Sequence, residues 1–106
     1  MSATSFNYPA FSPQASVSVT GSTTASLTPF PASTVISVDT ARVVNTGTVV
    51  AYIKFGDATV VADATTSIAL LPGVIEVFDP PNSATYFSVY APTGSPVVNV
   101  TVGVGA

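Results

Sequence analysis

The side chains that could carry chemistry in this chain are few: five acids, two cations and the hydroxyls of serine, threonine and tyrosine. The 106 residues include no histidine, cysteine or tryptophan. Nucleophilic catalysis usually needs a serine or cysteine beside a base, and histidine supplies that base most often. Lys54 could serve a serine in this way, but a single lysine on a strand typically extends into solvent. We therefore expect no enzymatic activity.

The five acids are the remaining candidates for catalysis or metal binding; they are Asp39, Asp57, Asp63, Glu76 and Asp79. A pair of carboxylates could hydrolyse a glycosidic bond, and carboxylate oxygens are typical ligands of Ca²⁺. Asp57 and Asp63 lie near a turn, but their spacing fits no calcium-binding loop. We expect these acids to cap turns and to keep the protein soluble, with no metal and no cofactor.

Three tyrosines suggest a different chemistry, which is stacking against a sugar ring. Tyr52, Tyr86 and Tyr90 fall on strand-like segments, and Tyr86 and Tyr90 share a face with Ser88. Carbohydrate platforms rely heavily on tryptophan, however, and aromatic residues in strands more often pack in a core or an interface. Sugar binding is therefore the less favoured interpretation of these residues.

Charge and hydropathy exclude two classes of partner. Arg42 and Lys54 are the only basic residues, and the net charge is −3. Nucleic acids and anionic membranes are bound by clusters of basic side chains, so we expect neither partner. The first ten residues lack the basic segment and apolar run of a secretory signal, which predicts synthesis in a cytosol.

The chain divides into a short N-terminal arm, residues 1–14, and a single domain, residues 15–106. Phe6, Tyr8 and Phe11 alternate with prolines and small polar residues in the arm, a composition that favours an extended segment. The arm is too short to form a core of its own. We expect its aromatic side chains to dock onto this domain or onto a neighbouring subunit.

Residues 15–106 have the pattern of an all-β domain. Apolar and polar residues alternate with a period of two, and Gly, Pro, Asn or Asp bounds each run. Many short strands separated by turns predict an antiparallel β-sandwich or jelly roll of about eight strands. The candidate strands are residues 15–20, 24–28, 34–38, 41–44, 49–55, 67–71, 74–78, 84–90 and 97–102. The expected core includes Val17, Val49, Ile53, Phe55, Phe87 and Val100.

Two turns have specific chemistry. The Asn45-Thr46-Gly47 segment fits a three-residue hairpin with Gly47 in the left-handed conformation, which would pair residues 41–44 with residues 49–55. The Leu71-Pro72-Gly73 segment fits a type II turn, because proline sets the first central torsion and glycine accepts the positive one.

Three segments together resemble small β-rich accessory proteins of tailed bacteriophages: residues 5–11 (SFNYPAF), 42–56 (RVVNTGTVVAYIKFG) and 71–78 (LPGVIEVF). The resemblance covers most of the chain and rests on strand and turn motifs. It implies a head decoration or cement protein, located on the virion, that binds the major capsid protein and copies of itself. The resemblance itself assigns no binding residues. From the residue pattern, we expect the partner contacts on the arm and on the tyrosine face, at Phe6, Tyr8, Phe11, Tyr52, Tyr86 and Tyr90. The alternative is a phage tail or host-recognition module that binds carbohydrate.

Overall fold

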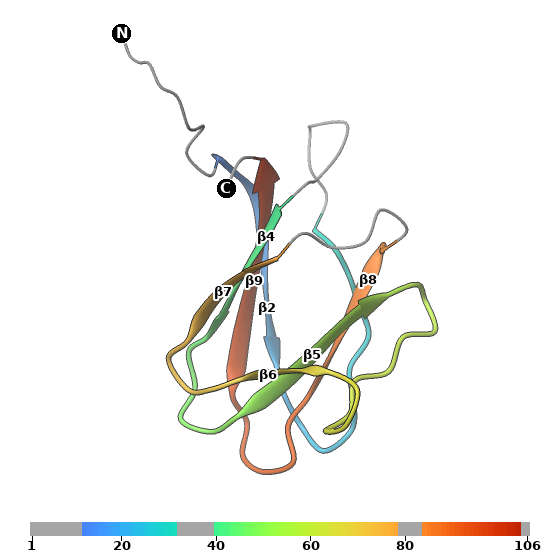
Figure 1. The fold of residues 1–106 in the computed structure, drawn as a ribbon, viewed down its shortest axis with the longest axis vertical. Coiled ribbons are helices and arrows are strands. Elements are labelled where there is room, and N and C mark those ends of the chain that lie inside the picture. Colours follow the sequence, from blue (N-terminus) through green and yellow to red (C-terminus); the bar gives the residue numbers. More distant parts are fainter. Residues whose placement is uncertain (1–11, 32–39, 79–83, 105–106) are drawn as a thin grey trace, which may run out of the picture.

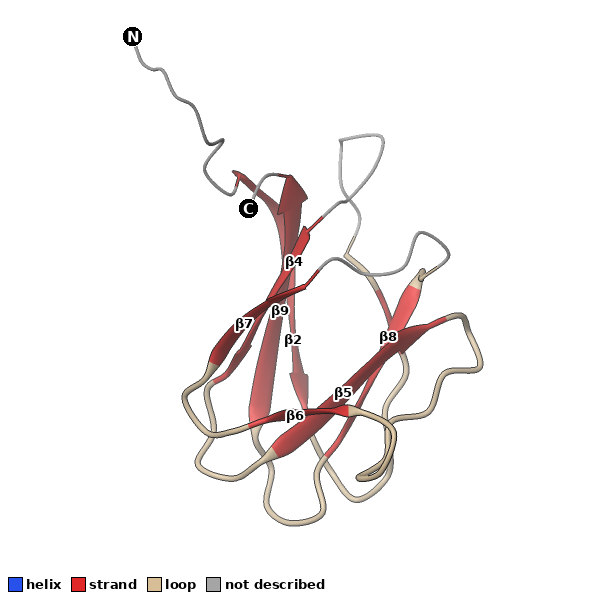
Figure 2. Ribbon diagram, in the orientation of Figure 1, coloured by secondary structure: helices blue, strands red, loops and turns tan. Residues whose placement is uncertain are grey.

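A computed structural model describes residues 12–31, 40–78 and 84–104, and these residues form strands and loops with no helix. The described part of the chain therefore has no helix that could span a membrane. Figure 2 shows the all-β architecture, which confirms the predicted fold class. The eight described strands are β2 (Ser12–Thr20), β3 (Thr28–Pro29), β4 (Thr40–Asn45), β5 (Ala51–Gly56), β6 (Ile68–Leu70), β7 (Ile75–Phe78), β8 (Tyr86–Tyr90) and β9 (Val97–Val104).

The strands form two four-stranded antiparallel sheets that pack face to face (Figure 1). The first sheet has the order β2-β9-β4-β7, and the second has the order β3-β8-β5-β6. The pairs β2·β9, β3·β8, β4·β7 and β5·β6 are nested along the chain, as in a long antiparallel ribbon rolled into two layers. This strand order is that of a jelly roll.

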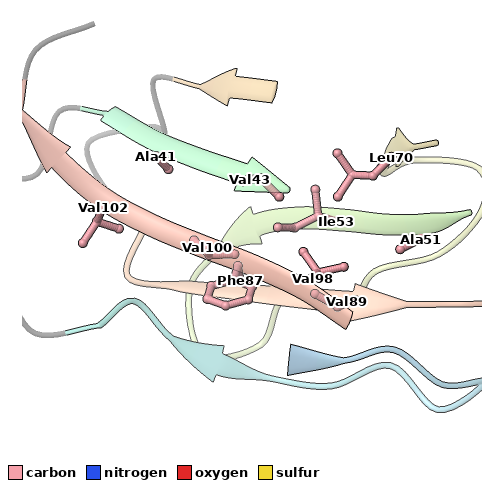
Figure 3. Packing of buried hydrophobic residues seen from close by; sticks show 10 residues of the cluster. All are labelled: Ala41, Val43, Ala51, Ile53, Leu70, Phe87, Val89, Val98, Val100 and Val102. Carbon is pink, nitrogen blue, oxygen red and sulfur yellow. The ribbon is translucent and has the colours of Figure 1, made fainter. Parts of the chain in front are cut away.

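The core lies between the two sheets and consists of the inward-facing residues of both (Figure 3). Three predicted core residues, Ile53, Phe87 and Val100, are completely buried. Val17 and Phe55 are partly buried and pack against this cluster. Val49 is also only partly buried, because it precedes β5 in the connection between the sheets. The fully buried cluster contains Ala41, Val43, Ala51, Ile53, Leu70, Phe87, Val89, Val98, Val100 and Val102.

The hairpin predicted at residues 45–47 is wrong. β4 pairs with β7 and β9 in the first sheet, whereas β5 pairs with β6 and β8 in the second, so the chain crosses between sheets here. Gly47 does not have a positive φ, which among the described glycines occurs only at Gly73 and Gly94. The need for glycine at position 47 is steric, since a Cβ atom there would lie 2.6 Å from the Cα of Pro96.

Asn45 explains why this segment crosses between the sheets instead of forming a hairpin. Its buried side chain donates hydrogen bonds from Nδ2 to the carbonyls of Val49 and Leu70, both at 2.9 Å. Its Oδ1 accepts the N–H of Gly47, also at 2.9 Å. One amide group therefore joins the end of β4 to the connection that follows it and to β6 in the opposite sheet.

The Leu71-Pro72-Gly73 turn has the predicted geometry. Gly73 has φ of +76°, and the N–H of Val74 donates to the carbonyl of Leu71 at 3.1 Å. These are the torsion and hydrogen bond expected of a type II turn. The turn leads from β6 to β7 and thus from the second sheet to the first.

Three other expectations for the strands need correction or lie outside the described residues. β2 begins at Ser12, so residues 12–14 belong to the sheet and not to the arm; Pro13 is accommodated because β2 is an edge strand. Of the predicted strand 24–28 only Thr28 is in a strand, since residues 21–27 form the crossing from β2 to β3. Residues 1–11 and the predicted strand 34–38 lie outside the described residues.

Candidate functional site

Asp57 and Asp63 cap the loop between β5 and β6, as expected from the sequence. The Asp63 carboxylate accepts the N–H groups of Thr66 at 2.6 Å and Thr65 at 2.9 Å, and also the Thr66 hydroxyl at 2.9 Å. These bonds, led by the Thr66 amide, lower the pKa of Asp63 to about 2. The hydroxyl and amide of Thr59 lower the pKa of Asp57 in the same way.

The capping bonds occupy the carboxylates that sequence analysis considered for catalysis or calcium. Both carboxyl groups are held in the charged form by donors from their own loop, which stabilises the loop and does not favour proton transfer. The described residues contain no group of three or more acids that could hold a metal ion. Asp39 and Asp79 lie outside the part of the chain that the structure describes.

The outer face of the second sheet brings two of the three predicted tyrosines together. Tyr52 and Tyr90 are directly paired between β5 and β8, and their ring centroids are 6.1 Å apart with an interplanar angle of 35°. Both side chains are half-buried. The rings therefore form a small aromatic surface that could contact a sugar or a protein.

Tyr86 is separated from this pair by the β5–β6 loop, residues 57–67, which folds across the sheet. Ser88 lies between Tyr86 and Tyr90 on the same face, and its Oγ accepts the N–H of Ala62 at 2.9 Å. Next to Tyr86 in the sheet is Gly56, where an added Cβ would lie 2.9 Å from Val60. The loop thus covers the middle of the face, and the three tyrosines do not form one platform.

β6 and β7 follow one another along the chain and are edge strands of the two sheets (Figure 1). Seven large hydrophobic residues are exposed among the described residues, and four of them lie between positions 68 and 77. We call these four the β6–β7 flank: Ile68 (38% exposed), Leu71 (59%), Ile75 (62%) and Val77 (50%). Ile75 and Val77 share the outer face of the first sheet, whereas Ile68 lies beside Ile53 on the inner face of the second sheet. Exposed apolar residues along one margin of a fold are one mark of a protein-binding surface.

The first sheet is chemically different at its two edges. On the outer face near β2, Asn99 donates from Nδ2 to the hydroxyls of Ser16 and Ser18, and Thr101 donates to the amide oxygen of Asn99. These polar side chains hydrogen-bond to one another on the exposed face. The apolar side of the same sheet is at β7, on the opposite edge.

The β6–β7 flank was not predicted from the sequence. Ile75 and Val77 alternate with Glu76, and this pattern normally places the two apolar residues in the core. In the structure they point outward, because β7 pairs Ile75 with Val44 and Val77 with Arg42 on the outer face of β4. Both faces of residues 74–78 carry apolar side chains, and that is the one signal in the sequence that could have identified this strand as an interface. The predicted contacts Phe6, Tyr8 and Phe11 lie outside the described residues.

Comparison with known proteins assigns no family to this chain. No family model matches the sequence, and neither does any curated protein. A similar solved structure is a chain from Bacillus endospore appendages, described as a novel family of disulfide-linked pili. It is 16% identical, the match covers 98% of this chain and 99% of that chain, and the TM-score is 0.46. Similarity at this level identifies neither a shared family nor a shared function.

Proposed function

We propose that the protein is a structural component of a phage particle, which binds the outside of the capsid together with copies of itself and stabilises the shell. The observation that supports this proposal is the β6–β7 flank, where two edge strands and the turn between them expose four large apolar side chains. A protein that acts only as a soluble monomer rarely concentrates exposed apolar residues in this way. We therefore place the partner surface on the β6–β7 flank.

The properties of the rest of the molecule are compatible with this role. The hydrogen-bonded carboxylates of the β5–β6 loop maintain a turn, and no catalytic role is needed to explain them. Charged residues make up only 7% of the chain, so contacts with a partner would depend on apolar and hydrogen-bonding area. On a capsid, many copies bind a repeated lattice, and weak individual contacts add up through high effective concentration.

Binding to isolated heads tests the proposal. Heads assembled from the capsid gene of the same phage genome, without this protein, are incubated with the purified chain and sedimented. We expect saturable binding of the wild-type protein. Leu71→Lys should weaken binding about tenfold or more, because a buried leucine contributes roughly 1.5–3 kcal/mol. Val61→Lys is the matched control, since Val61 is 60% exposed but lies in the β5–β6 loop. Absence of wild-type binding would reject the capsid role.

The Tyr52–Tyr90 pair favours a second candidate, a carbohydrate-binding module of a phage tail or host-recognition structure. Two adjacent rings on an accessible sheet face can stack on a sugar. Glycan-array binding that is lost in Tyr52→Ala and in Tyr90→Ala, but kept in Tyr86→Ala, would support this function. If no glycan binds to the wild-type protein, the candidate is eliminated.

A further inference from the structure

The edge of β7 differs from the other three sheet edges. An edge strand exposes unpaired backbone groups, and proteins normally protect it with proline, a bulge or a very short strand. β2 has Pro13 and a shift of register between Pro13 and Ala15, while β3 has two residues, one of which is proline. β6 has only three residues. β7 has four residues and neither a proline nor a bulge, and no described strand pairs with its outer edge. Its one charged residue, Glu76, pairs with Val43 and so lies on the opposite face from Ile75 and Val77.

The exposed side chains of β7 are complementary to those of the N-terminal arm. Ile75 and Val77 project from the outer face of the sheet, where an added strand would place every second side chain beside them. In the arm, Phe6, Tyr8 and Ala10 alternate with Asn7 and Pro9. Aromatic residues beside β-branched residues are among the more stabilising cross-strand pairs. The first eleven residues also contain no charged side chain, so the arm would bring no charge of its own to the edge, and Glu76 would remain on the face away from Ile75 and Val77.

Pro9 is compatible with this pairing. Along an edge strand, the N–H and C=O groups of one residue point toward the sheet, and those of the next residue point away from it. When the backbone groups of residues 6, 8 and 10 form hydrogen bonds with β7, those of residues 7 and 9 point away from the sheet. The N–H that Pro9 lacks is therefore not needed for a hydrogen bond to β7.

The arm of the same subunit cannot make these contacts. β2 and β7 are opposite edges of the first sheet, so a strand added beyond β7 would lie about four strand spacings, or ~19 Å, from β2. Tyr8 is four residues before Ser12, the first residue of β2, and four extended residues span at most about 14 Å. Tyr8 and Phe11 therefore cannot reach the β7 edge of their own chain.

We infer that residues 5–10 of one subunit add as an edge strand to β7 of a neighbouring subunit, with Phe6 and Tyr8 on the side of Ile75 and Val77. The inference rests on the self-association included in the proposed function and names the contact that produces it. Phe6 and Tyr8 would each bury roughly 150–250 Å². Together they would supply about half of the ~800 Å² per partner of a standard interface. Because the arm and β7 are different surfaces, the contact is head-to-tail and forms rings or chains.

Disulfide trapping tests the contact directly, since the chain has no cysteine of its own. A full-length Tyr8→Cys chain with a size tag is mixed, under mild oxidation and without heads, with an untagged Ile75→Cys or Val77→Cys chain. The matched control is Thr20→Cys, an exposed position on β2 at the opposite edge of the sheet. Circular dichroism first establishes that each variant is folded.

The expected result is a mixed disulfide between Tyr8→Cys and one of the β7 variants, at about tenfold or more the yield obtained with Thr20→Cys, because docking raises the effective concentration of the two thiols. Equal yields at β7 and at Thr20 would overturn the inference. So would homodimers of Val77→Cys as the main product, because β7 would then pair with β7. This assay contains no heads, so its result is independent of the capsid role. Cross-linking without head binding would reject only the capsid role. Head binding without cross-linking would reject only the addition of the arm to β7 of a neighbour.

Discussion

Asn45 is the single polar side chain that connects the most separate parts of the fold. Its three hydrogen bonds, to Gly47, Val49 and Leu70, lie in the interior between the two sheets. Asn45→Ala would leave two carbonyls and one N–H without these partners, so we expect a loss of about 2–4 kcal/mol in the free energy of unfolding. Urea denaturation measures it. Asn99→Ala, on the outer face, should cost less than about 1 kcal/mol, and equal losses in the two variants would contradict this role of Asn45.

Asp63 predicts a pH dependence of stability. Its pKa is about 2 in the folded protein and about 3.9 in an unfolded chain. Between these values the unfolded state binds more protons, so stability rises with pH in that range. The contribution of Asp63 is therefore complete above about pH 5 and is lost as the pH falls through the folded-state pKa near 2.

The Asp63→Asn variant tests this pH dependence by urea unfolding at a series of pH values. The difference in stability between wild type and variant should be largest near neutral pH and should shrink below pH 4, as the wild-type carboxylate becomes protonated. A difference that stays constant down to pH 2 would show that the capping bonds do not depend on the charge.

Elements from both sheets meet at a row of phenylalanines. Phe55 of β5 stacks on Phe30 at a centroid distance of 5.7 Å and contacts Phe78 of β7 edge-on at 5.5 Å. Because Phe55 contacts the opposite sheet, Phe55→Ala should reduce stability by about 3–5 kcal/mol. Ile68→Ala, on the edge strand β6, should cost about 1 kcal/mol or less. Thermal unfolding of both variants measures the difference, and a wild-type melting temperature for Phe55→Ala would remove this residue from the core.

The sequence was informative about elements and much less so about their pairing. Alternation and turn residues predicted seven of the described strands and the type II turn at Gly73, because both depend on local properties. The partner of β4 was predicted wrongly, since Asn45 and Gly47 form a local pattern that fits a hairpin and a sheet-crossing connection equally well. The choice between them depends on Leu70 and Pro96, which are distant in sequence.

The same limit applies to the candidate surfaces. Tyr52 and Tyr90 could be placed on strands from the sequence, but their pairing depends on the register between β5 and β8. The loop that isolates Tyr86 was not predictable, because its position over Ser88 is a tertiary contact. The flank residues Ile75 and Val77 have the pattern of a core strand, and only the strand order shows that they are exposed.

For the whole molecule, the arm should be needed for assembly and not for folding. A variant that lacks residues 1–10 retains every described strand, since β2 begins at Ser12. We expect its circular dichroism spectrum to remain that of a β protein, while sedimentation shows a smaller species and weaker attachment to heads. An unchanged oligomer and unchanged head affinity would mean that the arm is not the anchor.

The location of the protein within a phage particle tests the proposed function most directly. Particles produced by cells that carry the gene for this chain can be separated into heads and tails, and the protein in each fraction can be quantified by mass spectrometry. A capsid-stabilising protein should be found with the heads, at a copy number in a fixed ratio to the major capsid protein, and its loss should make the heads less resistant to heat. Recovery in the tail fraction, or absence from both fractions, would contradict the proposed function.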